Sequence, residues 1–237
     1  MNARCAEVRA VALLSGLLCI GLPRGTTAAE AGATLYGVAD VYVERISNGD
    51  NRPALRVESG GLAGSRLGVR IVEPLGSDLR AGLVLESGFN LDDGTPGQGG
   101  RFFGRQSYVH VGGAAGELRV GRQRSPLADL AQAARIGTTS YDATGALADI
   151  VEVADDFERI DNAVQYLAPI IGGVSVAAMA SSRLDGQEGG NDPAIGRNFG
   201  MRAIYARDAV TLGVAYHANR DSATTRQHEW LAAGSIV

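Results

Sequence analysis

Apolar and polar side chains alternate along most of this sequence. In the clearest run, Leu67, Val69 and Ile71 alternate with arginine and glycine residues. Because successive side chains of a β-strand point to opposite faces, a period of two predicts strands with one apolar and one polar face. Runs of this kind cover residues 34–44, 65–72, 78–89, 102–112, 117–122, 162–170, 173–182, 198–207, 209–219 and 227–237. We therefore predict an all-β chain with about ten strands.

The connections between these runs alternate in length. Short turns fall at 74–77, 112–116, 172–173 and 207–208, and long polar loops fall at 45–54, 92–101, about 123–160, 184–197 and 220–226. This pattern predicts an antiparallel up-and-down meander. A transmembrane β-barrel has such a meander, with apolar side chains outward and polar side chains inward. A secreted β-sandwich also alternates, but the arginine and glutamate residues at mid-strand and the unequal loops favour the barrel.

The barrel interpretation assigns one face of each strand to lipid. The side chains that share the apolar register of their strands are expected to face the bilayer. They are Leu35, Val41, Leu67, Val69, Ile71, Leu83 and Leu212.

The N-terminal segment has the layout of an export signal. Arg4 and Arg9 give a basic start, an apolar run covers 11–22, and small residues follow up to Ala31. The apolar run is shorter than the roughly 20 residues that a membrane-spanning helix needs. We expect residues 1–31 to be a signal peptide, cleaved after Ala29 or, preferably, after Ala31, and residues 32–237 to form the exported barrel.

Composition excludes several classes of site. Both cysteines, Cys5 and Cys19, lie in the expected signal, so the exported part has no disulfide and no cysteine-based zinc site. His110, His217 and His228 are far apart and match no metal-binding spacing. After Ala31 there are nineteen arginines, no lysine and twenty-four acidic residues, and this acidic balance argues against a nucleic-acid partner. We expect no metal and no cofactor.

The long loop at about 123–160 is the most unusual segment. It shows no sustained helical or alternating pattern, and connections of this length in compact proteins are usually functional. Seven acidic residues and one base, Arg135, lie between positions 126 and 158. The flanking strands carry Arg119, Arg122, Arg124 and Arg159. We therefore expect the loop and the strands to place opposite charges across a gap.

Six motifs are more specific than the alternation. They cover residues 34–40, 59–68, 85–91, 97–106, 121–123 and 162–169. Together they resemble the general trimeric porins of Gram-negative bacteria, in the branch typical of β-proteobacteria. The resemblance runs from about Thr34 to the end of the chain.

The resemblance implies a sixteen-stranded outer-membrane barrel whose third loop folds inward and narrows the lumen. It implies a homotrimer, with contacts from the early strands and the 92–101 loop, and passive diffusion of ions and small hydrophilic solutes. Arg66, Arg105 and Arg159 match arginines on the wall, whereas Arg101 and Arg124 are expected in loops or at the rim. The acidic partners on the loop are expected to be Asp149, Glu152, Asp155 and Asp156.

Two alternatives to a channel remain at this point. An enzyme is disfavoured, because the sequence has no Gly-x-Ser-x-Gly elbow and no supported Ser-His-Asp set. A plugged barrel with a structural or adhesive role would show the same alternation. The length leaves a further choice, since about ten strands are fewer than sixteen. We expect a C-terminally truncated or incomplete sequence, with a smaller barrel as the alternative.

Overall fold

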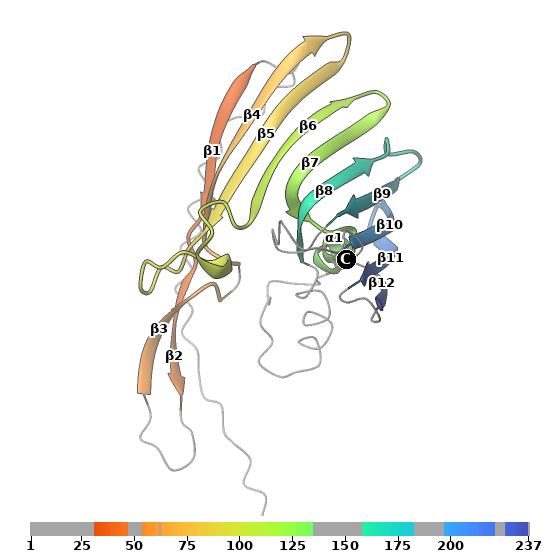
Figure 1. Ribbon diagram of the computed structural model, residues 1–237. Helices are drawn as coiled ribbons and strands as arrows, with labels where there is room; N and C mark the ends of the chain where they lie inside the picture. Colours follow the sequence, from red (N-terminus) through yellow and green to blue (C-terminus); the bar gives the residue numbers. More distant parts are fainter. Residues whose placement is uncertain are drawn as a thin grey trace, which may run out of the picture.

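The computed structural model describes residues 31–46, 54–61, 63–134, 158–182, 197–220 and 226–236. Its main element is one antiparallel sheet of ten strands in the order β1-β4-β5-β6-β7-β8-β9-β10-β11-β12 (Figure 1). The strands of this sheet are β1 (Gly32–Val38), β4 (Arg66–Gly76), β5 (Leu79–Gly88), β6 (Gln106–Gly113), β7 (Gly116–Arg124), β8 (Arg159–Leu167), β9 (Val174–Ser181), β10 (Arg197–Arg207), β11 (Val210–Arg220) and β12 (Arg226–Ile236). The predicted all-β meander is confirmed.

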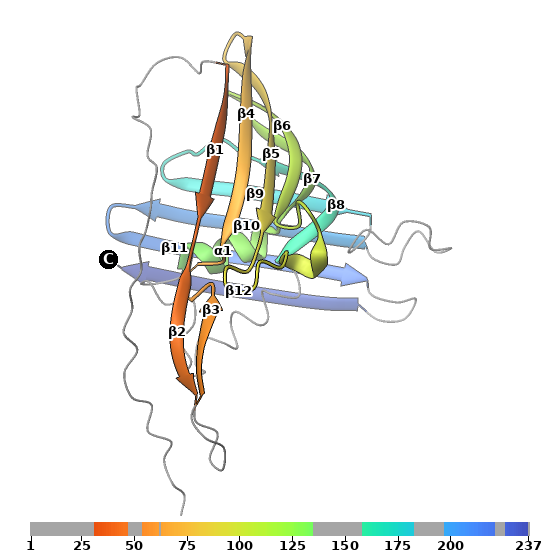
Figure 2. The same ribbon diagram turned by 90° about the vertical axis from the view of Figure 1, so that its left-hand side faces the viewer.

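The sheet is strongly twisted and curved. Figure 2 shows that the strand direction turns between β1 and β12, as the right-handed twist of strands requires. In the described part of the chain β1 and β12 are the two edges, so the sheet is open. A 3-10 turn, η1 (Gln98–Gly100), lies between β5 and β6. No helix within these described ranges is long and apolar enough to cross a membrane.

The two faces of the sheet differ in polarity. Leu35, Leu67, Ile71 and Leu212 are exposed on the outer, convex face, with Leu35 at 69%. Val41 is exposed in the neighbouring hairpin, and Val69 and Leu83 are half-buried in the same register. The opposite, concave face carries buried polar side chains, among them Glu86, Arg105, His110, Gln165, Asn198 and His217. The apolar-outward alternation is therefore confirmed.

The first predicted strand, 34–44, is wrong as a single element. The chain leaves the main sheet after β1 and forms a separate hairpin of β2 (Val41–Ile46) and β3 (Ala54–Ser59). Asp40 holds this break together: its carboxylate accepts from the Ala63 amide at 2.6 Å, and its carbonyl accepts from the Gly60 amide at 2.9 Å. Ser65 Oγ adds a bond to the same carbonyl at 3.0 Å. These bonds satisfy backbone groups that lost their strand partners.

The long loop contains a helix, which contradicts the expectation of no helical pattern. Helix α1 (Pro126–Ala134) lies on the concave side of the sheet, beside β10–β12 (Figure 1). Ser125 caps it, since its Oγ accepts from the Ala128 amide at 3.1 Å. Proline is favoured in the first turn because its missing N–H would be unpaired there. Leu127, Leu130 and Ala131 form a buried apolar face.

Candidate functional site

The candidate site is a cluster of arginines and carboxylates on the concave face, near the loop ends of β4, β5, β7 and β8. Glu86 lies at its centre. Arg105 Nε donates to Glu86 Oε1 at 2.7 Å, and the Tyr36 hydroxyl donates to Oε2 at 2.9 Å. The Arg105 and Glu86 side chains are only 10% and 7% exposed. Such a buried, charge-assisted pair neutralises both groups and fixes their positions.

Arg66 lies beside this pair but is bonded differently. Its Nη1 donates to the carbonyl of Gly64 at 3.0 Å, and within the described ranges it makes no ion pair with a carboxylate. Its electrostatic neighbours include Arg105, Glu86 and Arg124. Arg66 therefore adds a positive charge to the concave face that no described acid cancels by direct contact.

Arg159 completes the predicted arginine set. It forms an ion pair with the adjacent Glu158, and its side chain is 8% exposed. The guanidinium groups of Arg105, Arg124 and Arg122 are its other main electrostatic neighbours. Arg66, Arg105 and Arg159 thus belong to one cluster, although they come from β4, the segment before β6, and β8. Whether they line the narrowest part of a lumen stays a prediction.

Asp161 was missed by the sequence analysis. It is buried on β8 and accepts from Arg122 Nη1 at 2.5 Å and from Arg101 Nη1 at 2.7 Å. The predicted loop ends at about residue 160 and the predicted strand begins at residue 162, so Asp161 belongs to neither. Arg101 lies outside the strands as expected, but its side chain is tied to the wall through this carboxylate.

Arg124 lies at the loop end of a strand, which agrees with the expected loop or rim position. It ends β7, and its Nη1 donates to Gln132 Oε1 of α1 at 2.5 Å. Its Nη2 lies 3.7 Å from Glu158 Oε1. Arg124 therefore joins the loop helix to the wall.

Positive charge continues along the concave face toward the short turns. Arg70 lies over the Tyr36 ring, with Cζ 5.8 Å from the centroid, and Arg119 lies over Tyr108 at 5.1 Å. Arg119 Nε also donates to Glu117 at 2.7 Å. Arg70 makes no ion pair with any carboxylate in the described part of the chain.

The predicted acidic side of the constriction has no described position. Asp149, Glu152, Asp155 and Asp156 all lie outside the described residues. Of the acids in the long loop, Asp129 on α1 and Glu158 are described. Asp129 Oδ2 lies 3.3 Å from Arg202 Nε on β10. Burial raises the pKa of the Asp129 carboxyl, and the Arg202 guanidinium opposes that rise.

Comparisons with known proteins agree with this architecture. Residues 20–237 match the family described as Gram-negative porin. The chain is 32% identical over 202 residues to the outer membrane porin protein 32 of Delftia acidovorans, covering 81% of this chain and 56% of that protein. It is 36% identical over 126 residues to an outer membrane porin protein of Bordetella pertussis, covering 47% of this chain and 32% of that protein.

A solved structure shows the same fold. The anion-selective porin from Comamonas acidovorans matches with a TM-score of 0.70 and 25% sequence identity, over 87% of this chain and 64% of that one. This chain thus spans less than two thirds of each of these relatives.

The meander of two-faced strands and its charged concave face define an outer-membrane β-barrel protein. The family match covers most of the sequence, and the chain belongs to the Gram-negative porins. Its location is the bacterial outer membrane, as it is for the relatives named above.

Proposed function

We propose that the full-length protein forms a water-filled channel through which ions and small hydrophilic solutes diffuse passively across the outer membrane. The distribution of arginine carries this proposal: the candidate site and its extension lie on the concave face, opposite the exposed aliphatic side chains. An arginine at the lipid-facing midplane of a barrel costs about 2–4 kcal/mol, whereas one that faces water keeps its hydration. Porins are channels rather than enzymes, and no chemical step is needed here.

We also propose that the channel prefers anions. Arg66 and Arg70 face the concave side without an ion pair to a described carboxylate, while Glu86 is occupied by Arg105. Charged side chains at a constriction bias which ions pass. Low-dielectric walls strengthen their combined field. The likeness to a porin named as anion-selective supports the same preference.

The constriction itself remains a proposal. Arg66, Arg105 and Arg159 would form its basic side, and their common cluster supports this grouping. The acidic side would come from the loop residues Asp149, Glu152, Asp155 and Asp156. The helix on the concave side supports an inward course for the start of this loop.

Assembly and export complete the proposed function. The full-length protein would be a homotrimer after removal of residues 1–31, as the family resemblance implies. Exposed aliphatic side chains on β1 and β4, such as Leu35 and Leu67, would lie against lipid or a neighbouring protomer.

A swelling assay tests the channel. Liposomes that contain the folded, full-length protein should swell in an isotonic solution of a small uncharged sugar, because water follows a permeant solute inward. Protein-free liposomes provide the baseline. Folded protein that produces no swelling would indicate a plugged barrel with a structural or adhesive role.

A further inference from the structure

Helix α1 is fixed to a wall that is distant from it in sequence. It follows β7, but its buried Leu127 and Leu130 pack against Ile204 on β10 and Ala215 on β11, with Leu231 and Ala233 of β12 at the edge. Both leucines are fully buried. The helix therefore occupies the β10–β12 side of the concave space, opposite Arg66 and Arg70.

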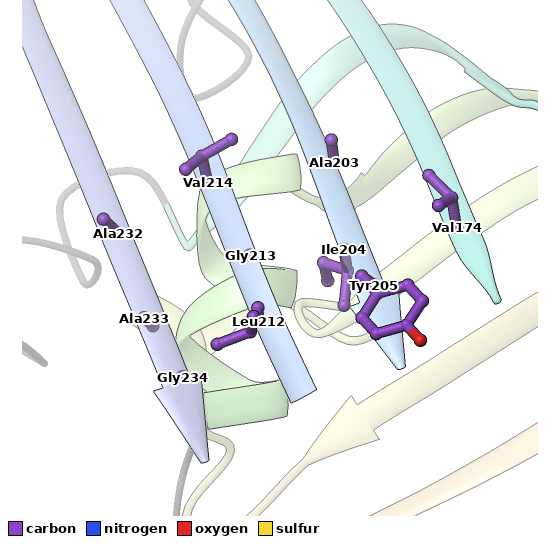
Figure 3. Close-up of a pocket in the computed structure, with 10 residues that line it drawn as sticks. All are labelled: Val174, Ala203, Ile204, Tyr205, Leu212, Gly213, Val214, Ala232, Ala233 and Gly234. Atoms are coloured by element: carbon purple, nitrogen blue, oxygen red, sulfur yellow. The ribbon is translucent and has the colours of Figure 1, made fainter. Parts of the chain in front are cut away.

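The helix packs closely against two glycines of the wall. A Cβ atom at Gly213 would lie 2.3 Å from Leu130 Cδ1, which is closer than real side-chain atoms approach. A Cβ atom at Gly200 would lie 3.2 Å from Pro126 Cδ. Figure 3 views this wall with α1 behind the strands and Gly213 of β11 near the centre of the view. Because Gly213 has no side chain, Leu130 occupies the space that a Cβ atom would fill, and this space is the seat for Leu130.

The hollow drawn in Figure 3 is not the seat for Leu130. Its volume is about 530 Å³, and it is lined mainly by apolar residues such as Val174, Leu212 and Val214. These three belong to the exposed outer register. The hollow therefore lies on the outer, apolar side of the sheet, whereas the seat for Leu130 opens to the concave side.

Polar contacts secure the same helix. Asp129 pairs with Arg202 of β10 at 3.3 Å, and Gln132 accepts from Arg124 of β7 at 2.5 Å. The helix is thus bonded to β7 and to β10, while its leucines pack against β10, β11 and β12. These contacts hold α1 against β10–β12, and they also join it to Arg124 at the edge of the arginine cluster.

We propose that Leu127, Leu130 and Gly213 are positioning residues that keep the passage open by holding α1 against the β10–β12 wall. A helix released from this wall enters the concave space and obstructs it. This inference rests on the proposed channel function. In this inference, apolar residues that do not contact the solute control how often the channel closes.

Single-channel recording of the full-length protein in planar bilayers tests the proposal. Leu130→Ala and Gly213→Ala should each raise the frequency of brief closures about tenfold or more, because both remove the fit between the leucine and its seat. Gly234→Ala is the matched control. It adds the same methyl group on β12, where the nearest side-chain atom is Leu212 Cδ2 of the outer register at 2.8 Å, and it should leave the closures unchanged.

A double substitution distinguishes a positioning role of Leu130 and Gly213 from a general loss of stability. Leu130→Val removes the δ carbons that a Cβ at position 213 would touch, so Gly213→Ala combined with Leu130→Val should close less often than Gly213→Ala alone. If Gly213→Ala fails to assemble, Leu130→Val alone should still close more often than wild type. Conducting variants with wild-type closure rates would overturn the positioning role. A folded wild type that never conducts would overturn the proposed channel and this inference with it.

Discussion

Arg105 and Glu86 form a buried pair, with Nε and Oε1 2.7 Å apart, on the concave face of the sheet. Arg66, one of its electrostatic neighbours, has no carboxylate bonded to it in the described part of the chain. Two arginines of one cluster therefore have different physical roles. Arg105 helps to hold the wall together, and Arg66 supplies charge to the space in front of it.

Glu86→Gln should destabilise the folded protein by about 3–5 kcal/mol, because it leaves the Arg105 guanidinium buried and unpaired. Denaturant unfolding in detergent would measure the loss. Asp208→Asn is the control: Asp208 lies 3.8 Å from Arg207 in an exposed turn, where an ion pair contributes about 0–1 kcal/mol. Equal effects of the two substitutions would show that Glu86 does not hold a buried charge.

Arg66→Gln should leave stability nearly unchanged, within about 0.5 kcal/mol, because Arg66 gives up one bond to a carbonyl and no ion pair. The same substitution should move the ion preference toward cations. Unfolding and reversal-potential measurements on one preparation would show both results. A large loss of stability without a change in preference would assign Arg66 a structural role.

Ser125→Ala should weaken α1 by about 0.5–2 kcal/mol, because the Ala128 amide loses the hydroxyl that caps it. Hydrogen exchange of the 126–134 amides should become faster. Ser77→Ala, in an exposed turn outside the helix, provides the comparison and should leave these amides unchanged. Unchanged exchange in Ser125→Ala would mean that wall contacts alone hold the helix.

Single cysteines test the two faces of the sheet. A cysteine at Leu67, Ile71 or Leu212 should react with a membrane-restricted thiol probe, because these side chains are exposed on the apolar face. A cysteine at Arg70, which points to the opposite face, should react with a water-soluble reagent. Reversed reactivity at Leu67 and Arg70 would reverse the assigned register.

The sequence predicts the strands better than it predicts the bonds between them. The period of two places Leu67 outward and Arg66 inward without knowledge of the partner strands. It does not show that Arg105 bonds to Glu86, because that contact depends on how the chain between β5 and β6 turns back. Asp161 is absent from the prediction for a smaller reason, since the predicted strand begins at residue 162 and β8 begins three residues earlier, at Arg159.

Helix α1 has a local signal in the sequence, whereas the break after β1 has none. Ser125 followed by Pro126 is a helix start, and Leu127, Leu130 and Ala131 have the spacing of one helical face. The break at Asp40 was harder to predict, because the alternation continues through it into β2. The four acids proposed for the constriction lie outside the described residues, so their role rests on the resemblance.

The reversal potential of the full-length channel under a salt gradient tests the central claim most directly. The wild type should have an anion-selective potential. Removing Arg66 and Arg70 together should shift it toward cations, and neutralising Asp149, Glu152, Asp155 and Asp156 should shift it toward anions. Arg207→Gln, at the exposed end of β10, should have little effect because salt screens its charge within roughly 8–10 Å. Equal reversal potentials in the wild type and both sets of variants would contradict the account, since the charged rows would then not face the path of the ions.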